Sequence, residues 1–215
     1  MSKTTWRPPD PNPFATRFVR PGAIPYLFPP GDSLEQLLQR LRASGGWGQI
    51  IGPHGSGKST LIAAMLPELQ RIGQEPHAVR LRDGWTRPAW GPIPNGASLV
   101  VLDGFEQLSR WGRAWLRHCC QRRGLGLVVT AHEPIGLPDL FRTDVTPEMA
   151  WRVLQRLDSN QEPLLAPERV AERLAAQAGN LRELLFELYD LHEHRRRNLA
   201  CRVRPWQTPG NSGGK

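Results

Sequence analysis

One short segment of the chain carries the residue types needed to bind a triphosphate. It fits the pattern GxxxxGK[ST] as Gly52-Pro53-His54-Gly55-Ser56-Gly57-Lys58-Ser59-Thr60. The glycines let backbone N–H groups converge on phosphate oxygens, because no Cβ atoms stand in the way. We expect Lys58 to reach the β- and γ-phosphates, Ser59 to offer its hydroxyl to Mg²⁺, and Thr60 to lie near the α-phosphate. The segment therefore predicts a site for ATP and Mg²⁺.

The elements on either side of this segment suit that role. Trp47–Ile51 is a short apolar run that predicts a buried strand. A helix should follow from about Gly57 to Leu66, where Pro67 is expected to kink or stop it. The N-terminus of such a helix adds a partial positive charge where the phosphates would lie.

A second buried strand, Ser98–Leu102, closes on an acid, Asp103. A carboxylate at this place can hold the Mg²⁺ shell through water. Many ATPases place Glu directly after the Asp, but here the next residue is Gly104, so slow turnover is expected. Glu106 is the nearest carboxylate, and it either activates water or only caps the following helix.

A third buried strand, Leu125–Val129, leads to a polar residue, Thr130. A polar side chain at the end of a strand beside the phosphate-binding loop could contact the γ-phosphate or the attacking water. Thr130 is the first candidate for this contact and His132 the second. The alternative is a simple exit of the strand into the Glu133-Pro134 turn.

The alternation of apolar strands and helices, with a weaker strand at His77–Leu81, predicts an α/β fold with a parallel sheet between helices. Glu106–Arg123 is expected to be one amphipathic helix, with Leu108, Trp111, Trp115 and Cys119 on one side and Arg110, Arg113 and Arg117 on the other. Helical patterns then follow at about 147–157, 167–178 and 180–196. We expect a Pro-rich arm (1–31), a nucleotide-binding core (32–146), a small helical lid (147–198) and a basic tail (199–215).

Composition narrows the functional classes. The net charge is +8 and hydrophobic residues make up 39% of the chain, enough for a sizeable core. Three cysteines, two of them adjacent, exclude a disulfide scaffold. The start of the chain has no apolar signal region and no run is long enough to span a membrane, so a cytoplasmic protein is expected. A dense basic cluster occurs only near the C-terminus, at Arg195, Arg196, Arg197, Arg202 and Arg204.

Together these motifs resemble the AAA+ branch of the P-loop NTPases. The resemblance covers about residues 12–195 and implies a three-layer sandwich with strand order 5-1-4-3-2 and an α-helical lid. Gly52–Thr60 then corresponds to the Walker A motif, Asp103 to the Walker B acid and Thr130 to the first sensor. Arg142, within Leu137–Arg142, resembles the family's arginine finger and would imply a homo-oligomer.

Two further segments share in the resemblance. Asn12-Pro13-Phe14 with Tyr26 is similar to the entry of secretion- and transposition-type AAA ATPases, where this part borders the adenine. Leu102–Leu108 is closer to the signal-transduction NTPases, so the subfamily and the protein partner stay open. Gly179–Leu184 resembles the second sensor, whose arginine is Arg182.

Local physics supports a special role for Arg182. Asn180 and Glu183 fit a capping box at the start of a helix. Arg182 then falls in the first helical turn, where the macrodipole disfavours a cation by a few tenths of a kcal/mol. A bound phosphate would offset that cost.

Two other functions fit the same motifs. A P-loop kinase would phosphorylate a small acceptor, held by the Trp85–Trp90 loop, and would place its second acidic strand next to the phosphate-loop strand. A non-catalytic adaptor would bind nucleotide, or nucleic acid through Arg110, Arg113 and Arg117. In the AAA+ type the strand ending at Thr130 lies between the two Walker strands, so strand order separates these hypotheses.

Overall fold

The computed structural model describes residues 12–81, 92–158 and 164–202. Five strands, β1 (Trp47–Ile51), β2 (Pro76–Arg80), β3 (Leu99–Asp103), β4 (Gly126–Ala131) and β5 (Asp139–Arg142), form one sheet in the order β2-β3-β4-β1-β5. Every neighbouring pair is parallel. This confirms the expected order 5-1-4-3-2. β4 lies between β3 and β1, which is the AAA+ arrangement and not the one expected for a kinase.

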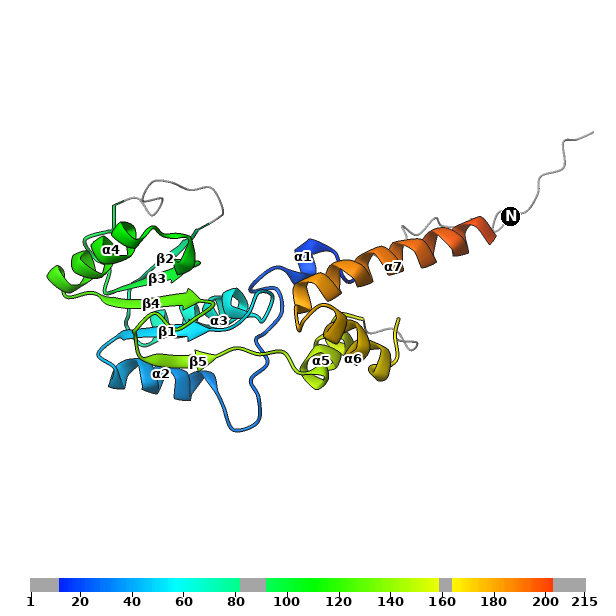
Figure 1. The fold of residues 1–215 in the computed structure, drawn as a ribbon, viewed down its shortest axis with the longest axis horizontal. Helices are drawn as coiled ribbons and strands as arrows, with labels where there is room; N and C mark the ends of the chain where they lie inside the picture. The colour runs from blue at the N-terminus through cyan, green and yellow to red at the C-terminus, as the bar shows by residue number, and fades with distance from the viewer. Residues whose placement is uncertain (1–11, 82–91, 159–163, 203–215) are drawn as a thin grey trace, which may run out of the picture.

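Helices cover both faces of the sheet (Figure 1). α2 (Leu34–Ala43) and α3 (Lys58–Arg71) share one apolar cluster with Leu99 and Val101 of β3. α4 (Arg110–Arg122) and the short 3₁₀ helix η1 (Phe105–Gln107) share another with Val100 and Leu102. Because successive strand side chains point to opposite faces, one buried strand supplies both layers.

α3 runs through Pro67 instead of stopping there. The expected end at Leu66 is therefore wrong by more than one helical turn. Met65 and Leu69 on either side of the proline are fully buried in the same cluster. Their packing against the sheet offsets the hydrogen bond that Pro67 removes.

The segment predicted as one helix over Glu106–Arg123 is two elements, and its orientation was predicted wrongly. α4 begins after Ser109, whose side chain accepts a hydrogen bond from the Gly112 N–H. Its buried residues are Leu116 and Cys120. Trp111 is 86% exposed and Trp115 50% exposed, although the sequence pattern placed both on one side with Leu108 and Cys119, which pack against the core.

Two arginines of α4 lie where the tryptophans were expected. The guanidinium groups of Arg113 and Arg117 lie 5.4 and 5.8 Å from the centre of the buried Phe105 ring. Arg113 donates to the carbonyl oxygens of Leu108 and Glu106, and Arg117 donates to that of Ile135. Arginine stems can cover apolar surface while their head groups find acceptors, and this explains the reversal.

The three C-terminal helices follow the sequence pattern closely. They are α5 (Pro147–Leu157), α6 (Pro167–Ala176) and α7 (Leu181–Arg202). They bury a cluster of their own, which contains Leu184, Leu185 and Leu188 of α7. The helices lie at the carboxyl end of the strands, and α7 extends away from the sheet (Figure 1). The boundaries of the arm, core, lid and tail stay predictions.

Residues 12–28, named the strap below, reach from the lid to the core. At one end, the Asn12 side chain donates to the Tyr189 carbonyl oxygen and to Glu193 of α7, each at 3.0 Å, and Phe14 is buried among the lid helices. At the other end, Tyr26 packs against the core cluster. Between them lies the single turn α1 (Thr16–Val19).

Some expectations lie outside the described residues, namely the Trp85–Trp90 loop and most of the basic tail. In the part that is described, no helix combines the length and apolar character needed to cross a bilayer.

Candidate functional site: the phosphate-binding loop

The GxxxxGK[ST] segment forms a tight loop between β1 and α3. Gly55 and Gly57 have φ angles of +71° and +93°, which side-chain-bearing residues rarely adopt. Gly57 is the N-cap of α3, and the Gly52 N–H donates to the Ala131 carbonyl oxygen at 3.2 Å. The loop is therefore shaped by its glycines and anchored to the end of β4. Ser59 and Thr60 follow in the first turn of α3.

Lys58 is buried within this loop. Its ammonium donates to the carbonyl oxygens of Gly52 and Pro53, with Nζ–O distances of 2.6 and 2.7 Å. Burial lowers the pKa of Lys58, while the charges of Glu106 and Asp103 act in the opposite direction. A buried cation whose hydrogen bonds go to neutral carbonyl oxygens would be stabilised further by an anionic partner.

Thr143, just after β5, holds the loop in place through hydrogen bonds, and the sequence did not predict this role. The hydroxyls of Thr143 and Ser56 lie 2.6 Å apart, and the Thr143 N–H donates to the Ile51 carbonyl oxygen at 2.7 Å. A Cβ on Gly52 would lie 2.1 Å from the Thr143 hydroxyl, so only glycine fits there. No local pattern could have shown this, because β5 pairs with β1 from about ninety residues away.

Asp103 and Thr130 meet as expected for neighbouring strand ends. The Thr130 hydroxyl donates to Asp103 Oδ1 at 2.8 Å and accepts from the Gly104 N–H at 2.8 Å. Asp103 Oδ2 also accepts from the Arg80 guanidinium at 2.8 Å. Arg80 was not predicted, although it lies opposite Asp103 in the register of β2 and β3. The carboxylate is thus held on both of its oxygens.

Glu106 does not cap α4, because Ser109 does. It lies in η1, and its Oε1 is 3.5 Å from Nε2 of His132. Its Oε2 is buried and has no hydrogen-bond partner among the residues that the structure describes. The His132 ring in turn packs against His54 of the loop, with 3.8 Å between ring centres. Burial lowers the pKa of His132, and this favours its neutral form. One carboxylate oxygen beside the loop is therefore unsatisfied within the described structure.

The first turn of α7 lies directly against the loop. A Cβ on Gly55 would lie 1.7 Å from Oδ1 of Asn180. That oxygen caps α7, accepting from the N–H groups of Arg182 and Glu183 at 3.1 and 3.3 Å. The Arg182 charge is near enough to lower the pKa of Lys58. The lid thus contributes a cation to the same site.

Tyr26 of the strap closes another side of the loop. Its ring would lie 3.2 Å from a Cβ on Gly57, and it makes edge-on contacts with Phe28 and Phe141. Its hydroxyl is buried and has no hydrogen-bond partner in the described structure. Burial, and then the charges of Asp32 and Asp144, raise its pKa. An unsatisfied buried hydroxyl next to the loop is a polar contact available to a ligand.

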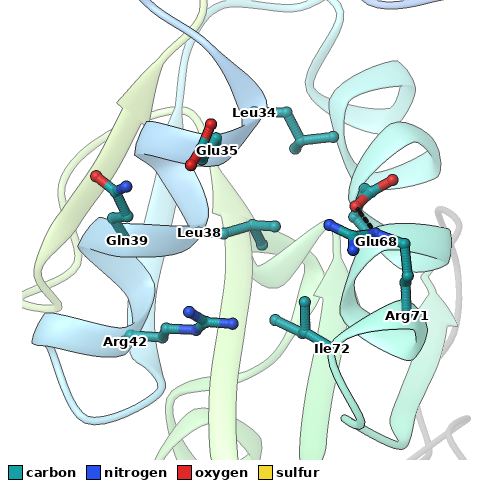
Figure 2. Close-up of a pocket in the computed structure, with 8 residues that line it drawn as sticks. All are labelled: Leu34, Glu35, Leu38, Gln39, Arg42, Glu68, Arg71 and Ile72. Atoms are coloured by element: carbon teal, nitrogen blue, oxygen red, sulfur yellow. Dashed lines mark hydrogen bonds and ion pairs between the residues drawn. The ribbon is translucent and has the colours of Figure 1, made fainter.

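Two other features lie apart from this cluster. Arg142 is at the end of β5 and pairs with Asp139, at 2.7 Å, on an edge strand. A groove of about 400 Å³ lies between α2 and the C-terminal end of α3, at the opposite end of that helix from the loop. In Figure 2 the side chains of Leu34, Leu38 and Ile72 point toward one another across it.

The contact between Gly55 and the lid gives a sharp prediction. Gly55→Ala should weaken nucleotide binding about tenfold or more, because the new methyl group must displace Asn180 and with it the start of α7. Gly45→Ala is the matched control, since Gly45 has a similar φ of +67° but nothing within 4 Å of its Cβ position. Titration of both variants with a fluorescent ATP analogue measures the effect. Equal affinities would mean that the lid contact does not matter for binding.

Comparison with known proteins supports the fold. The chain matches no protein-family model and no curated protein. Its structure resembles the replication initiator DnaA bound to AMPPCP and single-stranded DNA (TM-score 0.52, 14% identity, 82% of this chain and 67% of that one). It also resembles a DNA replication initiation factor (0.53, 16%, 80% and 66%) and Drosophila ORC bound to DNA (0.50, 15%, 86% and 68%).

These likenesses show the fold alone: the parallel sheet with helices on both faces is an arrangement that this chain shares with DnaA and ORC. The chain spans about two thirds of the length of each of these proteins.

Proposed function

We propose that this protein binds ATP with Mg²⁺ in the Gly52–Thr60 loop and hydrolyses it slowly, acting as an AAA+-like nucleotide-dependent switch. One observation carries the proposal. The charges of Asp103, Glu106 and Arg182 act on the buried ammonium of Lys58 within the loop, and Thr130 holds Asp103 in place. A purely structural lysine would not need that convergence.

The residues present fit a triphosphate. The loop offers converging N–H groups and the N-terminus of α3, and Lys58 and Arg182 supply positive charge. The unpartnered Tyr26 hydroxyl lies on the side where the resemblance places the base. Glu106 Oε2, also unpartnered, is the acceptor available to orient water.

The residues also fit Mg²⁺, which prefers oxygen ligands and keeps several waters. Ser59 and Asp103 would hold it, and the ion would neutralise charge on the phosphates. Since both Asp103 oxygens already accept hydrogen bonds, we assign Asp103 a contact through water.

The lid supplies the switching element. Arg182 and Asn180 connect α7 to the loop, so loss of the γ-phosphate would remove an anionic partner of Arg182. The repositioned lid would then change what a partner protein contacts. Arg142 is the candidate for a contact between copies, once released from Asp139.

Calorimetric titration of the full chain with ATP tests this function. Binding is expected with Mg²⁺ present, and EDTA should weaken it about tenfold, because the ion offsets phosphate charge. Non-hydrolysable ATP should bind as tightly as ATP. If ATP binds no better than inorganic phosphate with Mg²⁺ present, the proposed function is wrong.

A further inference from the structure

The outward side of α4 combines exposed aromatic rings with positive charge that no acidic residue of the helix offsets. Every residue on this side is exposed, and in helical spacing they form one stripe, named the α4 outer face: Trp111, Ala114, Trp115, His118 and Arg122. Trp111, at 86%, is the most exposed large hydrophobic residue of the described chain. Large exposed aromatics of this kind mark interaction sites.

The charge on α4 is all of one sign. The helix and its caps, Ser109–Arg123, contain five arginines and no acidic residue. Arg113, Arg117 and Arg123 donate to backbone carbonyl oxygens, which leave their charge in place. Arg110 and Arg122 are exposed and have no hydrogen bond or ion pair within the described residues. The face therefore fits an anionic partner.

We propose that the α4 outer face binds a single-stranded polynucleotide. Trp111 and Trp115, one helical turn apart on the same side, offer their rings to unpaired bases, and Arg110 and Arg122 contact phosphates. α4 is rigid enough for this role, since it is capped by Ser109 and held by Leu116 and Cys120. The proposal is independent of the proposed function, because none of these four residues belongs to the nucleotide site.

Other occupants fit this face less well. A helix that lies in a membrane surface needs a broad apolar side. On the α4 outer face the only apolar residues are the two tryptophans and Ala114, and His118 and Arg122 lie beside them. A symmetric contact with a second copy would bring the same arginines together without any carboxylate on the helix to pair them.

Fluorescence anisotropy of a labelled 20-nucleotide single-stranded DNA, at low salt and without ATP, tests the stacking contacts. Trp111→Ala and Trp115→Ala should each weaken binding about 5-fold or more. Phe186→Ala is the matched control, because it removes a ring that is 46% exposed on α7. Circular dichroism checks that the variants fold, as expected for exposed positions.

The dependence of affinity on salt tests the phosphate contacts. Removing two contacts with Arg110→Ala/Arg122→Ala should reduce the slope of log affinity against log salt by about 1.4, at about 0.7 per phosphate on a single strand. Arg20→Ala/Arg42→Ala removes the same charge from elsewhere and should leave most of the slope.

Several outcomes would overturn the proposal. These are no binding by the wild type, equal binding by the tryptophan variants, and tighter binding of duplex DNA than of single strands. Tryptophan-dependent binding only to phosphatidylserine vesicles, or burial of the α4 outer face through dimer formation, would also overturn it. ATP binding is measured separately, so its failure would leave this result unaffected.

Discussion

Lys58→Ala is expected to lower the affinity for ATP with Mg²⁺ at least 100-fold while leaving the fold intact. Removing one partner of a buried charge pair costs about 3–5 kcal/mol, and each 1.4 kcal/mol is a factor of ten in affinity. The free protein loses less, because its buried ammonium contacts only the carbonyl oxygens of Gly52 and Pro53. Calorimetric titration measures the affinity, and thermal unfolding checks the fold.

The same lysine sets a pH dependence and has a matched control. Burial holds the pKa of Lys58 below its ordinary value of 10.5, and phosphate charge would raise it on binding. Affinity should therefore fall as pH rises through the lowered pKa of the free protein. Lys215→Ala removes the same charge elsewhere and should bind normally. An unchanged affinity in Lys58→Ala would refute the assignment of the loop.

Glu106→Gln is expected to lower ATP turnover about 100-fold or more while changing ATP affinity by less than about threefold. General-base catalysis contributes about 10²–10⁴-fold, and an amide cannot accept the proton. Among the described residues, Glu106 is the carboxylate with a buried, unpartnered oxygen whose charge acts on Lys58. Release of inorganic phosphate measures turnover, with Lys58→Ala as the background.

Glu133→Gln is the control for this change. The charge of Glu133 also acts to raise the pKa of His132, but Glu133 is exposed and lies beyond the end of β4. It should keep wild-type turnover. Equal rates in Glu106→Gln and the wild type would show that another group orients the water.

The nucleotide loop was predictable because its nine residues are contiguous and its neighbours are strongly apolar. Four of the five strands and all three C-terminal helices follow from patterns of the same local kind, although β2 gave the weakest signal. β5 was not located from sequence, since Asp139–Arg142 has only two buried residues, Leu140 and Phe141, and is preceded by a proline. Such a short segment becomes a strand only through its pairing with β1.

The errors in the site have a common origin. Arg80 and Thr143 reach it through pairing between distant strands, and a single sequence does not show strand register. The exposure of Trp111 and Trp115 was not predictable either, because the sequence pattern groups them with Leu108 and Cys119, which do pack on the core. The structure instead uses Arg113 and Arg117 to cover Phe105, while the backbone supplies acceptors for their guanidinium groups.

The strap has a mechanical consequence. Its two anchors, Phe14 among the lid helices and Tyr26 beside the loop, are twelve residues apart, and a fully extended chain of that length would span about 40 Å. The four residues of α1 occupy about 6 Å as a helix and would reach about 13 Å if stretched. Unfolding this one turn would lengthen the strap by several ångströms. The C-terminal helices could then move by that distance relative to the core while Phe14 and Tyr26 keep their contacts.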